Sequence, residues 1–133
     1  MIQPGDSAEA TLVVSEEDTA AALAMSPDDS FPAVFATARM IALMEVAASR
    51  LMQPMLATGE LSVGVSVNVT HTAPTPVGAT VRGTATYLGQ EGKLFRFRVA
   101  VSDEAGVVGE GEHVRAIIDN QRMLSRAAKR KQL

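Results

Sequence analysis

The feature that most constrains this fold is one long apolar segment, at residues 33–56, that only strand-like segments follow. Its apolar residues recur at helical spacing and occupy more than one face of the predicted helix. A helix that is apolar nearly all round has to be covered by other elements. Because Arg39, Glu45 and Arg50 interrupt the segment, we do not expect it to span a membrane.

Strand patterns lie on both sides of this helix. Before it, residues 9–14 predict a first strand, and Ser15 with the acidic residues after it predicts the start of a short helix. After it, short turns join four further strand-like segments. In the first of these, valines alternate with polar residues, so the valines are expected to share one face. The four segments cover residues 61–72, 79–88, 94–102 and 107–119.

This order of elements indicates an α+β fold in which an antiparallel sheet of about five strands wraps around one central helix. That arrangement is the hotdog fold. Such a sheet leaves its edges and part of the helix uncovered, and two chains side by side would cover both, so we expect a homodimer or a dimer of dimers. Residues 1–122 are predicted to form the single domain, and residues 123–133 a basic, solvated C-terminal tail.

Composition excludes several classes of function. A chain of 133 residues without cysteine is expected to form one core, with neither disulfides nor thiolate chemistry. The net charge of −3 gives no reason to expect a nucleic-acid partner. The first residues do not resemble a signal peptide, which predicts a cytoplasmic protein. The two histidines have no carboxylate cluster beside them, so no metal site is predicted.

Two ionisable residues are candidates for catalysis. Glu45 lies within the predicted central helix, where a carboxylate is costly unless it is paired, protonated or used in chemistry. Its alternative role is an ion pair with Arg39, Arg50 or a second chain. His71 follows the alternating valines with the same parity, so in a strand without a bulge its ring points toward the helix. The alternative for His71 is a half-buried ring bonded to a neighbouring carbonyl.

Thr37 is a third candidate, in the first turn of the helix. It precedes Glu45 by eight residues, which is roughly 12 Å along the helix axis. One substrate carbonyl does not easily reach both side chains, so either Thr37 bends back or the site combines two chains, and we favour the second. The helix N-terminus would offer free N–H groups to an oxygen that gains charge. Alternatively, Thr37 only caps the helix.

Arg115 is a further candidate. It would contact an anionic ligand or form a structural ion pair.

Four motifs give the chain a resemblance to a known family. They are FPAVFAT at residues 31–37, LME at 43–45, VTHTAPTP at 69–76 and GEHVRA at 111–116. In this order and spacing the chain resembles the fluoroacetyl-CoA thioesterase-like group of hotdog-fold thioesterases, over residues 31–119. The resemblance implies a catalytic set of Thr37, Glu45 and His71. It also implies substrate contacts from Phe31, Gly64 and Arg115, with Phe31 closing over the acyl pocket.

The activity implied by this resemblance is hydrolysis of a short or medium acyl-CoA thioester to the free acid and coenzyme A. Coenzyme A is then part of the substrate, and no bound cofactor is needed. Glu45 would act as nucleophile or base, with Thr37 supporting it and His71 moving protons. The alternatives are an enoyl-CoA hydratase or dehydratase on the same fold, and a non-catalytic acyl-CoA-binding protein. The fluoroacetyl-specific member has an aromatic residue where this chain has Asp28, so fluoroacetyl-CoA specificity is not assumed.

Overall fold

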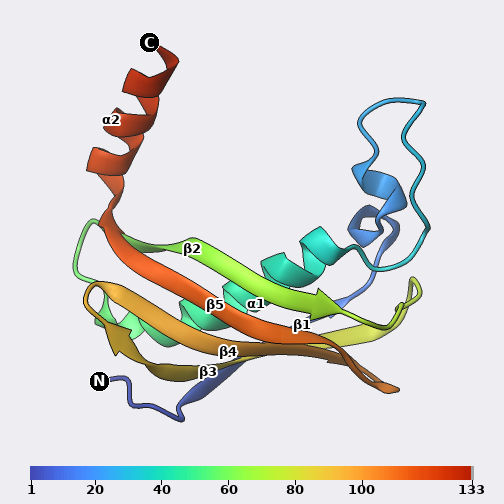
Figure 1. The fold of residues 1–133 in the computed structure, drawn as a ribbon, viewed down its shortest axis with the longest axis horizontal. Helices are drawn as coiled ribbons and strands as arrows, with labels where there is room; N and C mark the ends of the chain where they lie inside the picture. Colours follow the sequence, from blue (N-terminus) through green and yellow to red (C-terminus); the bar gives the residue numbers. More distant parts are fainter. Residues whose placement is uncertain (133) are drawn as a thin grey trace.

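The computed structural model describes residues 1–132 and contains one antiparallel sheet of five strands that curves around the helix α1 (Figure 1). This helix spans Thr37–Met52. The predicted sheet wrapped around one central helix is therefore confirmed. The strands are β1 (Ser7–Val13), β2 (Glu60–His71), β3 (Thr80–Glu91), β4 (Leu94–Asp103) and β5 (Gly106–Asp119).

The strands lie in the order β1-β3-β4-β5-β2, so β1 and β2 form the two edges of the sheet. Tight hairpins join β3 to β4 and β4 to β5. Gly92 lies in the first turn and Gly106 follows the second, with φ of 61° and 136°, values that residues with a Cβ rarely adopt. Within residues 1–132, β2 pairs only with β5, and its other side is an unpaired edge of the sheet.

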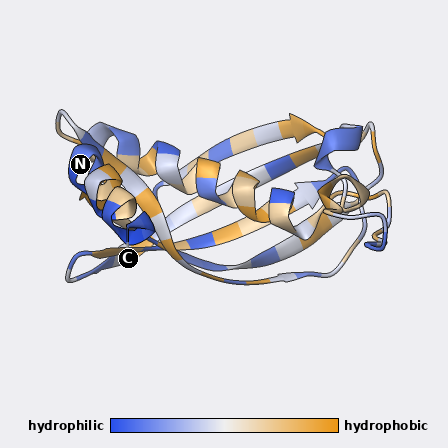
Figure 2. Ribbon diagram, turned by 90° about the horizontal axis from the view of Figure 1, so that it is seen from above, coloured by the Kyte–Doolittle hydropathy of each residue, from blue (hydrophilic) through white to orange (hydrophobic). Residues whose placement is uncertain are grey.

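The core lies between α1 and the face of the sheet that curves around it. From the helix, Met40, Met44 and Met52 are fully buried. In β3 and β4 buried residues alternate with exposed or half-buried ones, so that Phe97 and Val99 face the helix while their neighbours lie on the opposite face of the sheet. Figure 2 shows this alternation of hydrophobic and hydrophilic residues along the strands. The pattern explains why these segments could be predicted from sequence.

The sheet covers only one side of α1. On the uncovered side Val46 is 41% exposed, and Glu45 and Ser49 are half-buried. Ala38 and Ala42 continue this open face of α1 toward the helix N-terminus. Five strands thus leave part of the helix uncovered, as we expected for a sheet of this size.

The helix α1 is shorter than the predicted span of residues 33–56. At its start Phe35 is extended, because its N–H donates to the Thr75 carbonyl at 2.9 Å. At its end Pro54 lies in a 3₁₀ turn, η3 (Gln53–Met55). Tertiary pairing at one end and proline at the other therefore override the helical pattern.

Residues 15–36 form an arm that projects beyond the sheet (Figure 1). The short helix predicted here is instead two 3₁₀ turns, η1 (Glu16–Asp18) and η2 (Ala21–Leu23). The start signal acts as predicted, since the Ser15 N–H donates to Asp18 Oδ2 at 2.9 Å. An α-helix does not propagate because the Ala20 N–H donates to the Val34 carbonyl, across the arm.

One residue of β2 has no partner in β5. Gly64 pairs with Arg115 and Ser66 pairs with Val114, so Val65 between them forms a β-bulge. A bulge reverses the parity of the residues that face the core. The prediction that the alternating valines of this strand share one face is therefore wrong, because they fall on both sides of the bulge.

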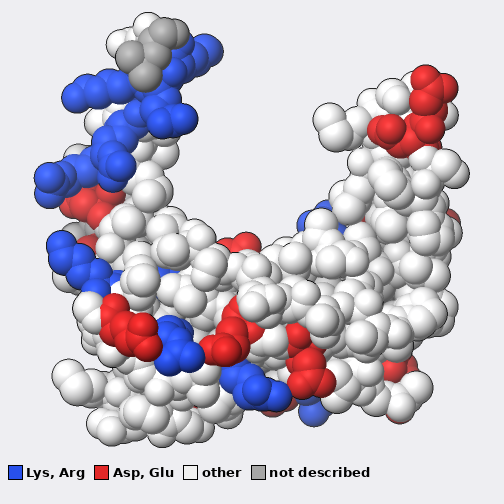
Figure 3. Space-filling model, viewed as in Figure 1, with Lys and Arg blue, Asp and Glu red and all other residues white. Residues whose placement is uncertain are grey.

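The strand β5 ends at Asp119, whose side chain accepts a hydrogen bond from the Arg122 N–H and caps α2 (Asn120–Lys131). This helix buries no residue and projects from the sheet, carrying Lys and Arg along it (Figures 1 and 3). The predicted basic tail therefore includes a helix that the sequence analysis did not identify. No helix within residues 1–132 is long and apolar enough to cross a membrane.

Candidate active site

One part of the candidate site is a contact between Thr37 and His71. Thr37 is the first residue of α1 and His71 is the last of β2, and Thr37 Oγ1 lies 2.8 Å from His71 Nδ1. Phe35 packs edge-on against the imidazole, with ring centroids 6.4 Å apart. The ring therefore meets the helix, at the helix N-terminus. Its parity does not account for this position, because that prediction assumed a strand without a bulge and β2 has one.

The second ring nitrogen of His71 is unpaired. Nε2 is buried, and no residue within 1–132 forms a hydrogen bond with it. An unpaired buried polar atom costs free energy comparable to that of a lost hydrogen bond. A ligand or a second chain that supplied a partner would recover this free energy.

The N-terminus of α1 is not capped by a side chain. Its N-cap residue is Ala36, which has no side-chain acceptor for the N–H groups of the first turn. Uncapped N–H groups and the helix dipole together favour a negative charge at this end of the helix. The side chain of Thr37 therefore stands beside backbone donors that can stabilise a developing oxyanion.

The second part of the candidate site is an ion pair between Glu45 and Arg115. Arg115 Nη1 lies 2.9 Å from Glu45 Oε2, and the two side chains are 7% and 40% exposed. Glu45 is thus only half-buried in the single chain, although the sequence predicted that other elements cover this helix. Its partner is not Arg39, which pairs with Asp18, nor Arg50, which donates to the Glu9 carbonyl.

Arg115 is held from several directions. Its Nε donates to Ser62 Oγ at 3.1 Å, and its Nη2 donates to the Ser62 carbonyl at 2.9 Å. Its Nη1 also lies 3.1 Å from His113 Nε2.

Burial lowers the pKa of His113, and the positive charge of Arg115 lowers it further. The sequence analysis missed the contacts of Ser62 and His113, although the spacing of His113 and Arg115 on one strand places them on the same face.

Gly64 lies against the carboxylate of Glu45. A Cβ at this position would stand 2.5 Å from Glu45 Oε2 and 3.3 Å from His113 Cε1. Since opposed residues of an antiparallel pair share a face, Gly64 faces the same side as Arg115, its partner in β5. The bulge at Val65 is what allows both Gly64 and His71 to face the core from one strand.

Phe31 lies in the arm and is 51% exposed. It lines a cavity of about 480 Å³ together with Thr37 at the start of α1. The other lining residues come from the arm and the first helical turn: Ala20, Leu23, Met25, Asp29, Ala36 and Ala38. The structure therefore places Phe31 near Thr37, at the end of α1 where His71 also lies.

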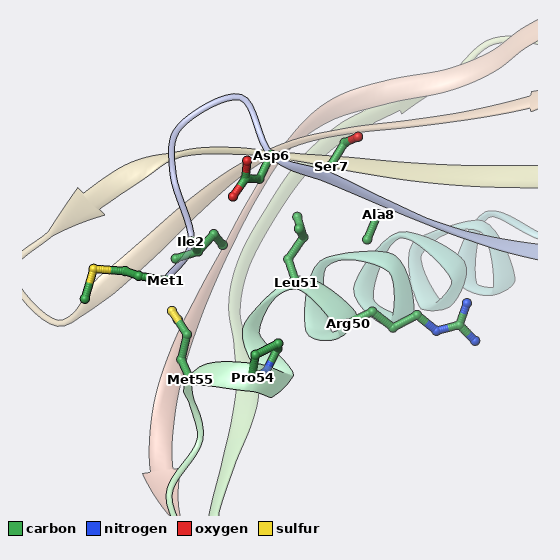
Figure 4. Close-up of a pocket in the computed structure, with 9 residues that line it drawn as sticks. All are labelled: Met1, Ile2, Asp6, Ser7, Ala8, Arg50, Leu51, Pro54 and Met55. Atoms are coloured by element: carbon green, nitrogen blue, oxygen red, sulfur yellow. The ribbon is translucent and has the colours of Figure 1, made fainter.

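A larger cavity, of about 610 Å³, lies at the opposite end of α1 (Figure 4). Its lining includes the apolar residues Met1, Ile2, Leu51 and Met55, and Arg50 borders it. It contains none of the residues proposed for the site. Its size alone therefore does not make it a candidate for the chemistry.

The six predicted site residues fall into two clusters along α1. Thr37, His71 and Phe31 lie at its N-terminus. Glu45, Gly64 and Arg115 meet farther along it, roughly 12 Å away by helix rise. Within the described chain no hydrogen bond joins Glu45 to Thr37 or His71. One chain thus brings each cluster together without joining the two.

Comparison with solved structures assigns the architecture to the hotdog fold of thioesterases. A structure of the fluoroacetyl-CoA thioesterase FlK superposes with a TM-score of 0.92 at 37% identity, over 97% of each chain. An FlK variant in complex with fluoroacetate and CoA superposes with a TM-score of 0.87 at 39% identity, over 92% of this chain and 99% of that one. A thioesterase-superfamily member from Thermus thermophilus gives a TM-score of 0.87 at 27% identity, over 99% and 95% of the two chains.

Sequence comparison narrows this class to one family. The sequence model of the family of fluoroacetyl-CoA-specific thioesterases matches residues 14–121 of this chain. A fluoroacetyl-CoA thioesterase from Streptantibioticus cattleyicolor is 48% identical over 88 residues, which are 66% of this chain and 63% of that protein. The chain belongs to the family of fluoroacetyl-CoA-specific thioesterases. The hotdog fold and the family resemblance predicted from the motifs are both confirmed.

Proposed function

We propose that this protein is a cytoplasmic acyl-CoA thioesterase that hydrolyses a short or medium acyl-CoA thioester to the free acid and coenzyme A. The observation that carries the proposal is the pairing of Thr37 with His71 at the uncapped N-terminus of α1. It places a hydroxyl, an imidazole and free backbone donors side by side. Membership of a thioesterase family supports the same reaction class.

In this proposal Glu45 attacks the thioester carbon or activates the water that does so. Arg115 binds its Oε2, and Oε1 forms no hydrogen bond within residues 1–132, so one oxygen is held while the other is available for chemistry. His71 gives a proton to the leaving thiolate, and Thr37 supports the ring. The N–H groups at the start of α1 receive the carbonyl oxygen as it gains charge. The reaction consumes one water molecule and requires no cofactor.

We infer that a complete active site forms between two copies of the chain. The open face of α1 and the unpaired edge of β2 are the surfaces that a second copy would cover. Two antiparallel α1 helices that cross near Ile41 would place Thr37 of one copy beside Glu45 of the other, since Ile41 is midway between them. This arrangement would unite the two clusters that one chain keeps apart.

Steady-state hydrolysis of an acyl-CoA panel tests this function. The panel contains acetyl-, fluoroacetyl-, butyryl- and octanoyl-CoA, with crotonyl-CoA added to detect hydration instead of hydrolysis. Glu45→Ala and His71→Ala should each lower kcat by at least about tenfold. Glu91→Ala, in the β3–β4 hairpin, is the matched control and should retain the wild-type rate. No thioester cleaved above background, or full activity in both site variants, would contradict the proposal.

A further inference from the structure

His113 is a buried imidazole for which the proposed reaction has no role. It lies on β5 and is 1% exposed. Its Nδ1 lies 2.8 Å from the Ser66 carbonyl oxygen of β2, and its Nε2 lies 3.1 Å from Nη1 of Arg115. Both ring nitrogens therefore have partners, whereas among residues 1–132 the ring of His71 has a partner at Nδ1 alone.

The chemistry of these partners determines the tautomer of the ring. A carbonyl oxygen only accepts hydrogen bonds, so Nδ1 of His113 must carry a proton and donate it to Ser66. A guanidinium only donates hydrogen bonds, so Nε2 must be the unprotonated acceptor for Arg115. The arrangement is satisfied by the neutral ring with its proton on Nδ1, and by no other form.

This contact determines how Arg115 meets the carboxylate. Nη1 of Arg115 has two N–H groups, and it contacts His113 Nε2 at 3.1 Å and Glu45 Oε2 at 2.9 Å. Ser62 accepts from Nε and Nη2 on the other side of the guanidinium. The planar guanidinium is therefore fixed in one orientation, with its remaining Nη1 donor directed at Glu45.

We propose that His113 is a positioning residue, which accepts a hydrogen bond from Arg115 and thereby holds the Glu45 carboxylate in its working orientation. The inference rests on the proposed function, because it assigns His113 to the carboxylate that would carry the reaction. His113 contacts no substrate in this scheme. It acts only through Arg115.

The surroundings of the ring support the neutral form. Burial is the largest influence and lowers the pKa of His113; the hydrogen bond to Ser66 raises it, the Arg115 charge lowers it and the Glu45 charge raises it. Arg115 from β5 and Glu45 from α1 are the charged groups that face the ring, while β4 presents Phe97 opposite it. A proton on Nε2 would set two donors against each other and displace Arg115 from the ring.

The tautomer can be measured in the wild-type protein. The chain has two histidines, so long-range ¹H–¹⁵N spectra of protein labelled at histidine contain two rings, and His113→Gln assigns them. We expect His113 to carry its proton on Nδ1 at pH 7. A proton on Nε2, or a charged ring at that pH, would overturn the proposal. This measurement needs no variant to fold beyond the one used for assignment.

Two substitutions of similar size test the positioning role. His113→Leu removes the acceptor, whereas His113→Gln retains an amide oxygen that can accept from Arg115. We expect His113→Leu to lower kcat at least about tenfold with KM changed less than about twofold, and His113→Gln to stay within about threefold of wild type. Equal rates in the two folded variants would overturn the proposal, because a residue that only fills space would not need an acceptor.

A third measurement separates this inference from the proposed function. If wild-type protein hydrolyses no thioester, the proposed function fails, but the orientation of Arg115 can still be followed. The Nη groups of Arg115 should rotate slowly in wild type and His113→Gln. They should rotate faster in His113→Leu, where the contacts with Ser62 and Glu45 remain but the acceptor of His113 is gone. Equal rotation rates in the two variants would show that His113 does not hold Arg115.

Discussion

At the scale of single residues, the site depends on glycine, which has no side chain, as well as on the residues that react. The carboxylate of Glu45 contacts Arg115 in the space beside Gly64, where a Cβ would stand 2.5 Å from Glu45 Oε2. Gly111 has a different reason to be glycine, since a Cβ there would meet the Asn68 carbonyl and Val69 Cα of β2. One glycine makes room for a reactive group, and the other makes room for a neighbouring strand.

Gly64→Ala should impair catalysis more than stability. The added Cβ would displace the flexible end of Glu45 from Arg115, so we expect kcat to fall at least about tenfold while the free energy of unfolding changes by less than about 1 kcal/mol. Gly111→Ala, its matched control, should lower the free energy of unfolding by about 1–3 kcal/mol because backbone must move. Urea unfolding and steady-state rates measure both. Wild-type kcat in Gly64→Ala would show that Glu45 need not occupy this position.

The stability of the protein should depend on pH through His113. The unfolded chain takes up a proton on this ring below its ordinary pKa of 6.5, whereas the buried, neutral ring does not. The unfolded state then binds more protons, so the free energy of unfolding falls as the pH is lowered below 6.5, by at most about 1.4 kcal/mol per pH unit. The pKa of Asp103 is also lowered, but its ordinary value of 3.8 places its effect in more acidic solution.

Urea unfolding between pH 5 and pH 7 measures this dependence, and His113→Gln provides the comparison. The slope should be smaller in the variant, because glutamine does not titrate. A slope of the same size in both proteins would assign the dependence to other groups.

At the scale of elements, local patterns predicted most of the fold. Helical spacing and strict alternation are properties of neighbouring residues, so α1 and the strands were located to within a few residues. The bulge at Val65 could not be predicted, since an apolar residue in an alternating run carries no local sign of being unpaired. The Thr37–His71 contact depends on how β2 returns to α1, and α2 was missed because its charges resemble those of a disordered tail.

The predicted domain boundary can be tested by removing residues 123–133. The helix α2 buries no residue, so we expect the free energy of unfolding to change by less than about 1 kcal/mol and KM for acyl-CoA to stay within about twofold. Phe97→Ala, which removes a fully buried ring, should cost about 3–5 kcal/mol and shows that the assay is sensitive. A KM several-fold higher in the shortened chain would mean that the basic tail contacts the substrate phosphates.

At the scale of the whole molecule, the surfaces that the chain leaves open lie beside the residues proposed for chemistry. α1 shows one face to solvent, β2 ends the sheet, and each cluster of the candidate site contains a residue of α1. Figure 3 shows the arm and α2 rising on either side of this region, with acidic side chains at the tip of the arm and basic ones along α2. A second copy would close the space between them and complete the site.

Light scattering should therefore give a mass of about twice 14.0 kDa or a multiple of that dimer. Val46→Arg places a charge on the open face of α1 and should yield an inactive monomer. Val107→Arg is the matched control, at the β4–β5 hairpin. Val107 is 54% exposed and Val46 is 41% exposed, and the change at Val107 should leave the mass unchanged. An active monomer of wild-type protein would end the two-chain scheme.

The unpaired Val65 has a consequence for how this sequence can vary. Deleting its single codon would turn half of β2 over, so that either Gly64 or His71 would point to solvent. The deletion would leave every reactive side chain in the sequence. It would nevertheless remove Gly64 or His71 from the face of β2 on which the site lies. In alignments of this family, a gap at this position should therefore be given as much weight as the loss of a catalytic side chain.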